Sequence, residues 1–192
     1  MPERVLIQGY DENHDWLAEI TLPRMRAWCD ANGWEHRPVR FPISLAEDYN
    51  FRKYPLVLDA LNQGIETVVW CDLDVVPVSG RQLETHGAHI SISLDRCGIC
   101  AGFVAYENSE WTRQFVTGLL AIIPKVGRYH CHEQECLKAV VNIGEAVHNV
   151  RTIPESVVAN PCTPLDSRPT FFHLWANRGR AMVLNEILKL CI

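Results

Sequence analysis

The sequence lacks several features that would place it in common functional classes. It contains no GxGxxG dinucleotide fingerprint and no GxxxxGK[ST] phosphate loop. No apolar run approaches the roughly 20 residues that are needed to span a bilayer. The N-terminus has no basic segment followed by a long apolar one, so we expect neither a secretory signal nor a membrane anchor, and a cytoplasmic location.

An excess of positive charge is missing as well. The 192 residues include 18 Lys and Arg against 23 Asp and Glu, which gives a formal net charge of −5. This balance argues against a broad nucleic-acid-binding surface, although a modified base in DNA stays open as an acceptor. The hydrophobic content of 47% is typical of a globular chain, and we expect residues 1–192 to form one domain. The sequence gives no indication of the oligomeric state.

Eight cysteines are many for a chain without an export signal. The pair Cys97 and Cys100 and the segment from His130 to Cys136 could together supply zinc ligands. A non-catalytic, zinc-stabilised binding module is therefore one interpretation of the chain. Against it, no second CxxC completes the usual zinc pattern, and reduced thiols in a cytosolic compartment are the simpler expectation.

The hydrophobic pattern alternates between strands and helices along the whole chain. Strands are expected over residues 4–10, 34–41, 67–71, 89–94, 100–106 and 170–174. Helices are expected over residues 13–32, 53–64, 109–122, 133–142 and 177–190, and Pro23 should kink or split the first of them. This alternation predicts an α/β sandwich with a mostly parallel central sheet, in which ligands bind at the carboxyl ends of the strands.

The most informative segment runs from Thr67 to Val78. A run of β-branched residues ends at Asp72 and Asp74, and an extended strand would point both carboxylates to the same side. Two adjacent carboxylates repel each other and are costly to desolvate, so a buried strand rarely ends this way without a cation. The segment therefore predicts a site for Mg²⁺ or Mn²⁺ and a diphosphate, with a simple strand-ending turn as the alternative.

A second group of polar residues follows the first expected strand. Gly9, Tyr10 and Asp11 come at its carboxyl end, so they should line the same crevice as the two aspartates. Tyr10 could stack on a nucleobase or could equally cover the core.

The order of these segments resembles the GT-A glycosyltransferases, which use nucleotide-sugar donors and a metal bound by a DxD motif. The lysine-led helix at Lys53, the Asp72–Asp74 strand, the segment from Cys100 to Arg113 and the late strand at His173 are similar to the corresponding family segments. Cys100 stands where the family often has asparagine. The nearest pattern is that of the retaining α-galactosyl-, α-mannosyl- and α-xylosyltransferases, so the resemblance implies a Rossmann-like GT-A fold and a hexosyl- or pentosyltransferase.

The resemblance also implies a role for individual residues. Mn²⁺ or Mg²⁺ would bind to Asp72, Asp74 and His173, and the imidazole nitrogen favours Mn²⁺. A UDP-linked sugar donor would contact the cofactor-binding set of Gly9, Tyr10, Asp11, Lys53, Asp72, Leu73, Arg178 and Arg180. The catalytic set would comprise Gln134, Glu133 and Asp95. Gln134 would lie near the anomeric carbon in a retaining reaction, Glu133 would be the general base in an inverting one, and Asp95 would contact donor hydroxyls.

A second enzyme class shares these requirements. Nucleotidyl transfer to a sugar phosphate also uses a metal in an α/β crevice, but it requires a glycine-rich loop with a basic residue near the first strand. The segment Gly9-Tyr-Asp-Glu-Asn does not supply that loop. The acceptor is not encoded in any motif of the chain: a polysaccharide, a protein, a small molecule and a modified base are all compatible with it.

Overall fold

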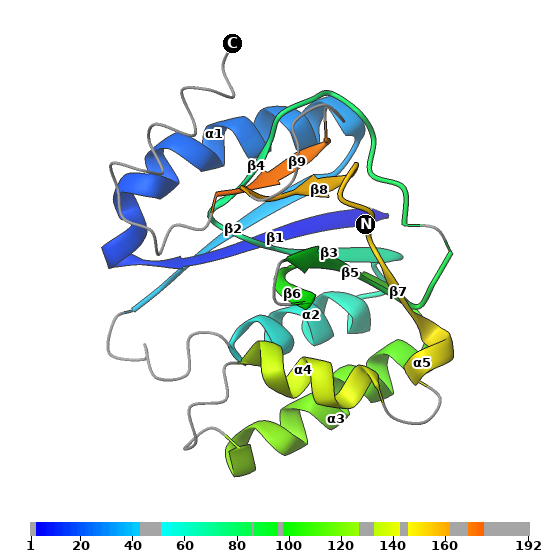
Figure 1. Ribbon diagram of the computed structural model, residues 1–192. Helices are drawn as coiled ribbons and strands as arrows, with labels where there is room; N and C mark the ends of the chain where they lie inside the picture. Colours follow the sequence, from blue (N-terminus) through cyan, green and yellow to red (C-terminus); the bar gives the residue numbers. More distant parts are fainter. Residues whose placement is uncertain are drawn as a thin grey trace.

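The central element of the computed structural model is a six-stranded sheet with the strand order β2-β1-β3-β6-β5-β7 (Figure 1). The structure describes residues 3–42, 51–85, 87–95, 98–126, 133–142, 146–161 and 169–174. The strands are β1 (Arg4–Asp11), β2 (Glu35–Phe41), β3 (Thr67–Asp72), β5 (Ile90–Asp95), β6 (Gly98–Glu107) and β7 (Val150–Thr152). Within this sheet β6 pairs antiparallel to β3 and β5, and the other pairings are parallel. The expected mostly parallel sheet is therefore confirmed.

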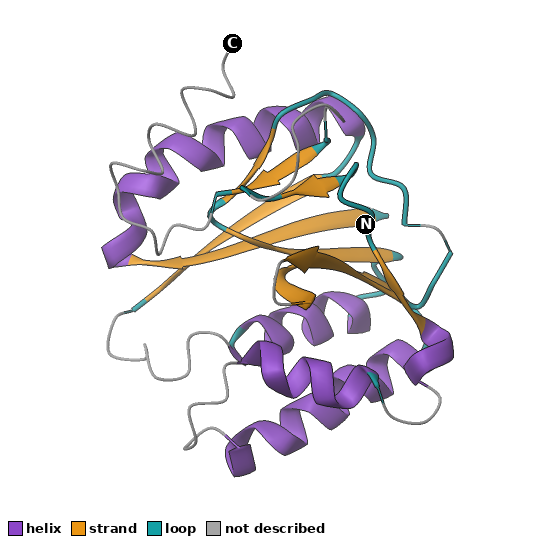
Figure 2. Cartoon of the chain, viewed as in Figure 1, coloured by secondary structure: helices purple, strands orange, loops and turns teal. Residues whose placement is uncertain are grey.

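Helices cover both faces of the sheet (Figure 2). One face carries α1 (Asp15–Asn32), which follows the short 3-10 helix η1 (Glu12–His14). The other face carries α2 (Lys53–Asn62), α3 (Glu110–Val126) and α4 (Glu133–Val141), and α5 (Ala146–Asn149) leads into β7. A small sheet lies on the α1 side and consists of β4 (Val75–Pro77), β9 (Phe171–His173) and β8 (Val158–Ala159). This arrangement is the predicted α/β sandwich.

The apolar runs of β1 and β3 form strands because both of their faces are buried. Along β1, Val5 and Ile7 join the cluster that α2 and α3 complete, whereas Leu6 joins the cluster on the α1 side. Along β3, Trp70 and Cys71 divide in the same way between the two clusters. The two central strands thus connect two apolar layers.

Of the two effects predicted for Pro23, a kink or a split of the first helix, the split is wrong. The helix α1 runs unbroken from Asp15 to Asn32 and ends at Gly33, whose φ of 71° is left-handed, as the Asn-Gly pair predicts. Pro23 cannot donate to the carbonyl of Glu19, but both residues are exposed, so water can satisfy that carbonyl.

Several short elements were not expected from the sequence. They are η1, β4, α5, β7 and β8, each of which spans two to four residues. Segments of this length are too short for a repeated pattern to be recognised, so hydrophobic periodicity does not reveal them. The helix that we expect over residues 177–190 lies outside the described residues. None of the helices in the described part of the chain is long and apolar enough to cross a membrane.

Gly9 allows two large rings to lie against the centre of the sheet. A Cβ atom at this position would lie 2.6 Å from Cε2 of Phe41 and closer still to the indole of Trp70. Both rings belong to the core cluster beneath α2. The absence of a side chain at residue 9 is therefore a packing requirement of the fold.

Two glycine substitutions should change stability in opposite directions. Gly9→Ala forces a methyl group into the Trp70 and Phe41 rings and should lower the free energy of unfolding by about 1–3 kcal/mol. Gly118→Ala fills open space on the exposed side of α3 and should raise it by about 0.5–1 kcal/mol, because alanine favours a helix. Urea denaturation of the two variants and the wild type measures both effects. A neutral Gly9→Ala would contradict the described packing.

Candidate metal centre

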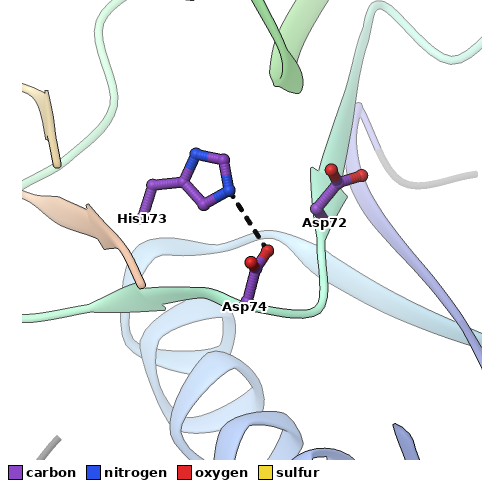
Figure 3. Close-up of side chains that lie close together, drawn as sticks. All are labelled: Asp72, Asp74 and His173. Carbon is purple, nitrogen blue, oxygen red and sulfur yellow. Dashed lines mark ion pairs between the residues drawn. The ribbon is translucent and has the colours of Figure 1, made fainter. Parts of the chain in front are cut away.

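Three side chains converge where β3 ends (Figure 3). Asp72 is the last residue of β3, Asp74 lies in the turn that leads to β4, and His173 is the last residue of β9. One ligand atom from each lies within 4.8 Å of the other two, and Asp74 Oδ1 is 3.3 Å from His173 Nε2. His173 reaches the aspartates because β9 pairs antiparallel with β4, which places it opposite Val75.

The backbone between the two aspartates is a turn and not the extended strand that we expected. β3 stops at Asp72, and Leu73 and Asp74 form the turn to β4. Leu73 points away from the carboxylates into an apolar cluster with Leu17 and Phe172. Its side chain therefore lies in the core, and only its backbone can contact a nucleotide. Burial of Leu73 brings the two carboxylates to one side in spite of the turn.

Asp72 is held by groups from its own strand and from two neighbouring elements, α2 and β1. Trp70 Nε1 donates a 2.7 Å hydrogen bond to Oδ1, and Lys53 Nζ lies 3.8 Å from the same oxygen. On the backbone side, Gln8 Nε2 donates to the Asp72 carbonyl at 3.3 Å. These contacts engage one carboxylate oxygen and orient the other, Oδ2, toward β6, where it would meet a Cβ atom at Gly102.

Lys53 is part of the wall of the site. Its side chain is 4% exposed, its ammonium donates to the Ala101 carbonyl at 3.0 Å, and it lies 5.3 Å from the centre of the Trp70 ring. Buried charges need a partner, and the Asp72 carboxylate provides one. In this position Lys53 supports the carboxylate of a candidate metal ligand.

A β-bulge in β6 opens space beside the three ligands. The neighbours Ile92 and Ser93 of β5 pair with Val104 and Cys100, so three residues of β6 stand between the paired ones. In this bulge a Cβ atom at Gly102 would lie 2.9 Å from His173 Cε1 and 3.0 Å from Asp72 Oδ2. The glycine therefore leaves room where the candidate ligand side chains meet. Bulges are common next to functional sites.

The charges around His173 balance those of the carboxylates. Burial disfavours the imidazolium, but the charge and hydrogen bond of Asp74 and the contact with Cys100 outweigh it, so the pKa of His173 lies well above its usual value. In the absence of a cation the imidazolium thus neutralises Asp74, while Lys53 neutralises Asp72. A cation that binds Nε2 has to displace the proton on that nitrogen.

The donor set fits a divalent cation. Ligands that bind one ion at about 2.1 Å can lie no more than about 4.2 Å apart, so atoms already within 4.8 Å need only small movements. Two carboxylates and one imidazole suit Mn²⁺, and Mg²⁺ accepts the oxygens.

The three residues at the end of β1 differ in their relation to this centre. Gly9 pairs with Asp72 across the parallel β1–β3 ladder, although the Trp70 and Phe41 rings cover it. Asp11 is buried, and its Oδ1 accepts from the backbone N–H of Asn13 at 3.0 Å and contacts His14 Nδ1 at 2.7 Å. Tyr10 is partly buried and packs against the Leu73 cluster. Nucleotide binding by these three residues stays a prediction.

The predicted catalytic residues are described only in part. Gln134 Oε1 accepts from the Ala101 N–H at 3.5 Å, so α4 contacts the bulge that borders the metal centre. Asp95 ends β5 and Glu133 begins α4, but their side chains lie outside the described part. Arg178 and Arg180 also lie outside the described residues, as do Cys97 and residues 130–132 of the predicted zinc cluster.

Sequence reasoning missed several contacts that shape the site. Trp70, Gln8 and Gly102 touch Asp72 or border it, and Cys100 touches His173. Trp70 offered a usable signal, because a residue two before Asp72 on a strand lies on the same face. Gln8 and Cys100 reach the site from other strands, so spacing along the chain gave no sign of them.

Comparisons with solved structures place the fold among glycosyltransferases. A glycosyltransferase involved in the glycosylation of the major capsid of PBCV-1 matches with a TM-score of 0.74 and 12% identity, over 97% of this chain and all of that one. GlyE of Streptococcus pneumoniae TIGR4 matches with a TM-score of 0.63 and 13% identity, over 98% of this chain and 64% of GlyE. The galactosyltransferase LgtC, solved with donor and acceptor sugar analogues, matches with a TM-score of 0.54 and 12% identity, over 88% of this chain and 86% of LgtC.

These structures are similar to the chain in fold, which agrees with the GT-A resemblance. Identities of 12–13% show a shared fold and do not show a shared activity. No protein-family model and no curated protein matches the chain.

A partly buried histidine beneath the site should make stability depend on pH. His36 Nε2 donates to Gln8 Oε1 at 2.9 Å, and Gln8 in turn binds the Asp72 carbonyl. Burial, aided by Arg26, lowers the pKa of His36 to about 4. As the pH falls, His36 is therefore protonated near pH 6.5 in the unfolded chain, but only near pH 4 in the folded chain. Stability contributed by neutral His36 is complete above pH 6.5 and lost as the pH falls toward 4.

The loss should be on the order of 1–2 kcal/mol at full protonation, less than the whole pKa shift would give because solvent screens the partly buried ring, and urea midpoints measured between pH 7 and pH 4 would show it. His36→Gln keeps a donor for Gln8 but does not titrate, so its curve should be flatter over this range. Parallel curves for the two proteins would contradict a neutral His36 in the folded protein.

Mn²⁺ should stabilise the folded protein through Asp74. At 100 times its dissociation constant the ion should add about 2.7 kcal/mol to the free energy of unfolding. Asp74→Asn should weaken Mn²⁺ binding at least about tenfold, because it removes a charged ligand atom. Asp59→Asn, which alters an exposed carboxylate on α2 that accepts from Gln63, serves as the matched control and should behave as wild type. Equal Mn²⁺ stabilisation in both variants would exclude this centre.

Proposed function

We propose that the chain is a metal-dependent glycosyltransferase that moves a sugar from a nucleotide-diphosphate sugar to an acceptor hydroxyl. One observation carries the proposal: Asp72, Asp74 and His173 converge at the carboxyl edge of a sheet whose fold is shared with glycosyltransferases. Ligands of such sheets bind at this edge. In this proposal residues 1–192 form a single catalytic domain.

In this proposal Asp72, Asp74 and His173 hold Mn²⁺ or Mg²⁺. The bound ion would supply a Lewis acid that offsets the negative charge on the leaving diphosphate. The protein's own contribution is orientation. Because Trp70 and Lys53 engage Oδ1 of Asp72, this carboxylate presents a single oxygen, Oδ2, to the centre. A ligand held in one position loses little entropy on binding, which favours a defined geometry.

The donor would extend from the metal centre in two directions. The nucleotide would lie toward the end of β1, where Tyr10 would offer a ring for stacking and Asp11 and Gly9 would contact the donor. Arg178 and Arg180, which follow His173 closely in the chain, would clamp the diphosphate with their forked donors. We propose a UDP-linked donor, because the segment around Asp72 and Asp74 resembles the DxD segment of GT-A glycosyltransferases, which use nucleotide-sugar donors.

The reacting sugar would lie next to the β6 bulge. Gln134 on α4 contacts Ala101 in this bulge, which is compatible with an amide near the anomeric carbon and with transfer that retains configuration. In the inverting alternative, Glu133 would remove the proton of the acceptor hydroxyl. Asp95, at the end of β5, would contact hydroxyls of the donor sugar.

The proposed function predicts metal-dependent turnover of a nucleotide sugar. A panel of UDP-, GDP- and CDP-linked hexoses and pentoses, incubated with the protein and Mn²⁺, should give release of the nucleoside diphosphate from a UDP-linked donor. Chelation with EDTA should abolish the release, and Asp74→Ala should lower its rate at least about 100-fold, because the leaving diphosphate loses its charge stabilisation. The exposed variant Glu110→Gln on α3 should leave the rate unchanged.

Three outcomes would contradict the proposal. Turnover that persists at full rate in EDTA would exclude metal dependence. Release of pyrophosphate from a nucleoside triphosphate and a sugar phosphate, with no turnover of any nucleotide sugar, would favour nucleotidyl transfer. Stoichiometric zinc bound by thiols in a protein that binds no nucleotide would favour the binding module.

A further inference from the structure

The thiol of Cys100 lies against His173, one of the three side chains of the candidate metal centre. Its sulfur is 3.5 Å from Nδ1 of His173, whereas the other ring nitrogen, Nε2, faces Asp74 (Figure 3). Cys100 is 2% exposed, and its own carbonyl accepts a 3.2 Å hydrogen bond from Ser93 Oγ. The sulfur thus occupies a defined position beside the ring and does not sample the solvent.

The two nitrogens of a neutral imidazole have different tasks when one of them binds a metal. Nε2 can donate its lone pair to a cation only if the ring proton resides on Nδ1. Ligating histidines usually give that proton to a fixed acceptor, which sets the tautomer and the orientation of the ring. In this chain the Cys100 sulfur is the neighbour at Nδ1.

We propose that Cys100 is a positioning residue for His173. It accepts the Nδ1–H of the ring and so directs the Nε2 lone pair toward the cation. The inference rests on the metal site of the proposed function and adds to it a residue that acts through His173 and does not touch the ion. Among the described residues, the cluster of mutually close ligand atoms comprises Asp72, Asp74 and His173 and does not include Cys100.

The choice of sulfur has a consequence for the strength of the site. A thiol is an uncharged and weak acceptor, whereas a carboxylate at the same place would add a negative charge and make the ring more basic. Cys100 therefore orients His173 without adding charge. The charge of the site is left to Asp72, Asp74 and Lys53, and we expect a readily exchanged ion.

Variants at Cys100 can separate orientation from packing. Cys100→Ala and Cys100→Val both remove the acceptor, and valine restores the volume that alanine loses. Cys100→Ser keeps a donor and acceptor at nearly the same place. Cys29→Ala is the matched control, because Cys29 is also a buried free thiol but lies on α1 in the core. The dissociation constant for Mn²⁺ alone, measured from the electron paramagnetic resonance of the free ion, is the first readout.

Loss of the acceptor should weaken Mn²⁺ binding about 10- to 100-fold in both Cys100→Ala and Cys100→Val, while Cys100→Ser stays within about threefold of wild type. Cys29→Ala should leave the affinity unchanged. At saturating Mn²⁺ the affinity for UDP should return to the wild-type value in all variants. In the Mg²⁺-loaded protein, the ¹H–¹⁵N signal of the His173 Nδ1–H should be present in wild type and Cys100→Ser and be shifted or exchange-broadened in Cys100→Ala and Cys100→Val.

Unchanged Mn²⁺ affinity in Cys100→Val would overturn the inference and leave the proposed function standing, because the wild type would still bind the ion. Equal weakening in Cys100→Ser and Cys100→Val, or in Cys29→Ala and Cys100→Ala, would also overturn it, since the loss would then reflect packing. Failure of the wild type to bind Mn²⁺ would remove the metal site itself, and with it both the proposed function and this inference.

Discussion

The repulsion between two neighbouring carboxylates is the constraint on which the site depends. Asp72 and Asp74 follow a buried strand and point to one side, an arrangement that costs free energy unless positive charge compensates it. The structure supplies that charge separately: Lys53 lies beside Asp72, and His173 lies beside Asp74. In the proposed function the buried lysine would remain when a cation binds, whereas the histidine would exchange its proton for the ion. The site is therefore prepared for a cation without being unstable in its absence.

The fold explains how residues so far apart in sequence meet. Parallel strands bring the ends of β1, β3 and β5 to one edge of the sheet, and the pairing of β9 with β4 adds His173 from the late part of the chain. The bulge in β6, with Gly102 at its centre, leaves the space into which the ligand side chains point. The strand pairings and the bulge are features of the backbone. The geometry of the site is therefore set more by the sheet than by the loops around it.

The sequence predicted the larger elements and the acidic part of the candidate site, because both leave local patterns. Alternating hydrophobic periodicity located the principal strands and the helices α1 to α4, and the Asp72–Asp74 spacing identified the centre of the site. The resemblance to GT-A enzymes added His173, which spacing alone could not have linked to the aspartates. What escaped prediction are contacts between strands, such as Trp70 against Gly9 and Gln8 between His36 and the Asp72 carbonyl. These depend on register and on the space left by a missing side chain, and neither is visible along a single strand.

The central claim, that Asp72, Asp74 and His173 hold one cation that binds a diphosphate, can be tested most directly by crystallography of the protein with Mn²⁺ and UDP. Anomalous scattering at the manganese edge should give a single strong peak within about 2.0–2.3 Å of Asp72 Oδ2, of one Asp74 oxygen and of His173 Nε2, in contact with the diphosphate. A manganese peak at another position, or a diphosphate bound away from these three side chains, would contradict the account.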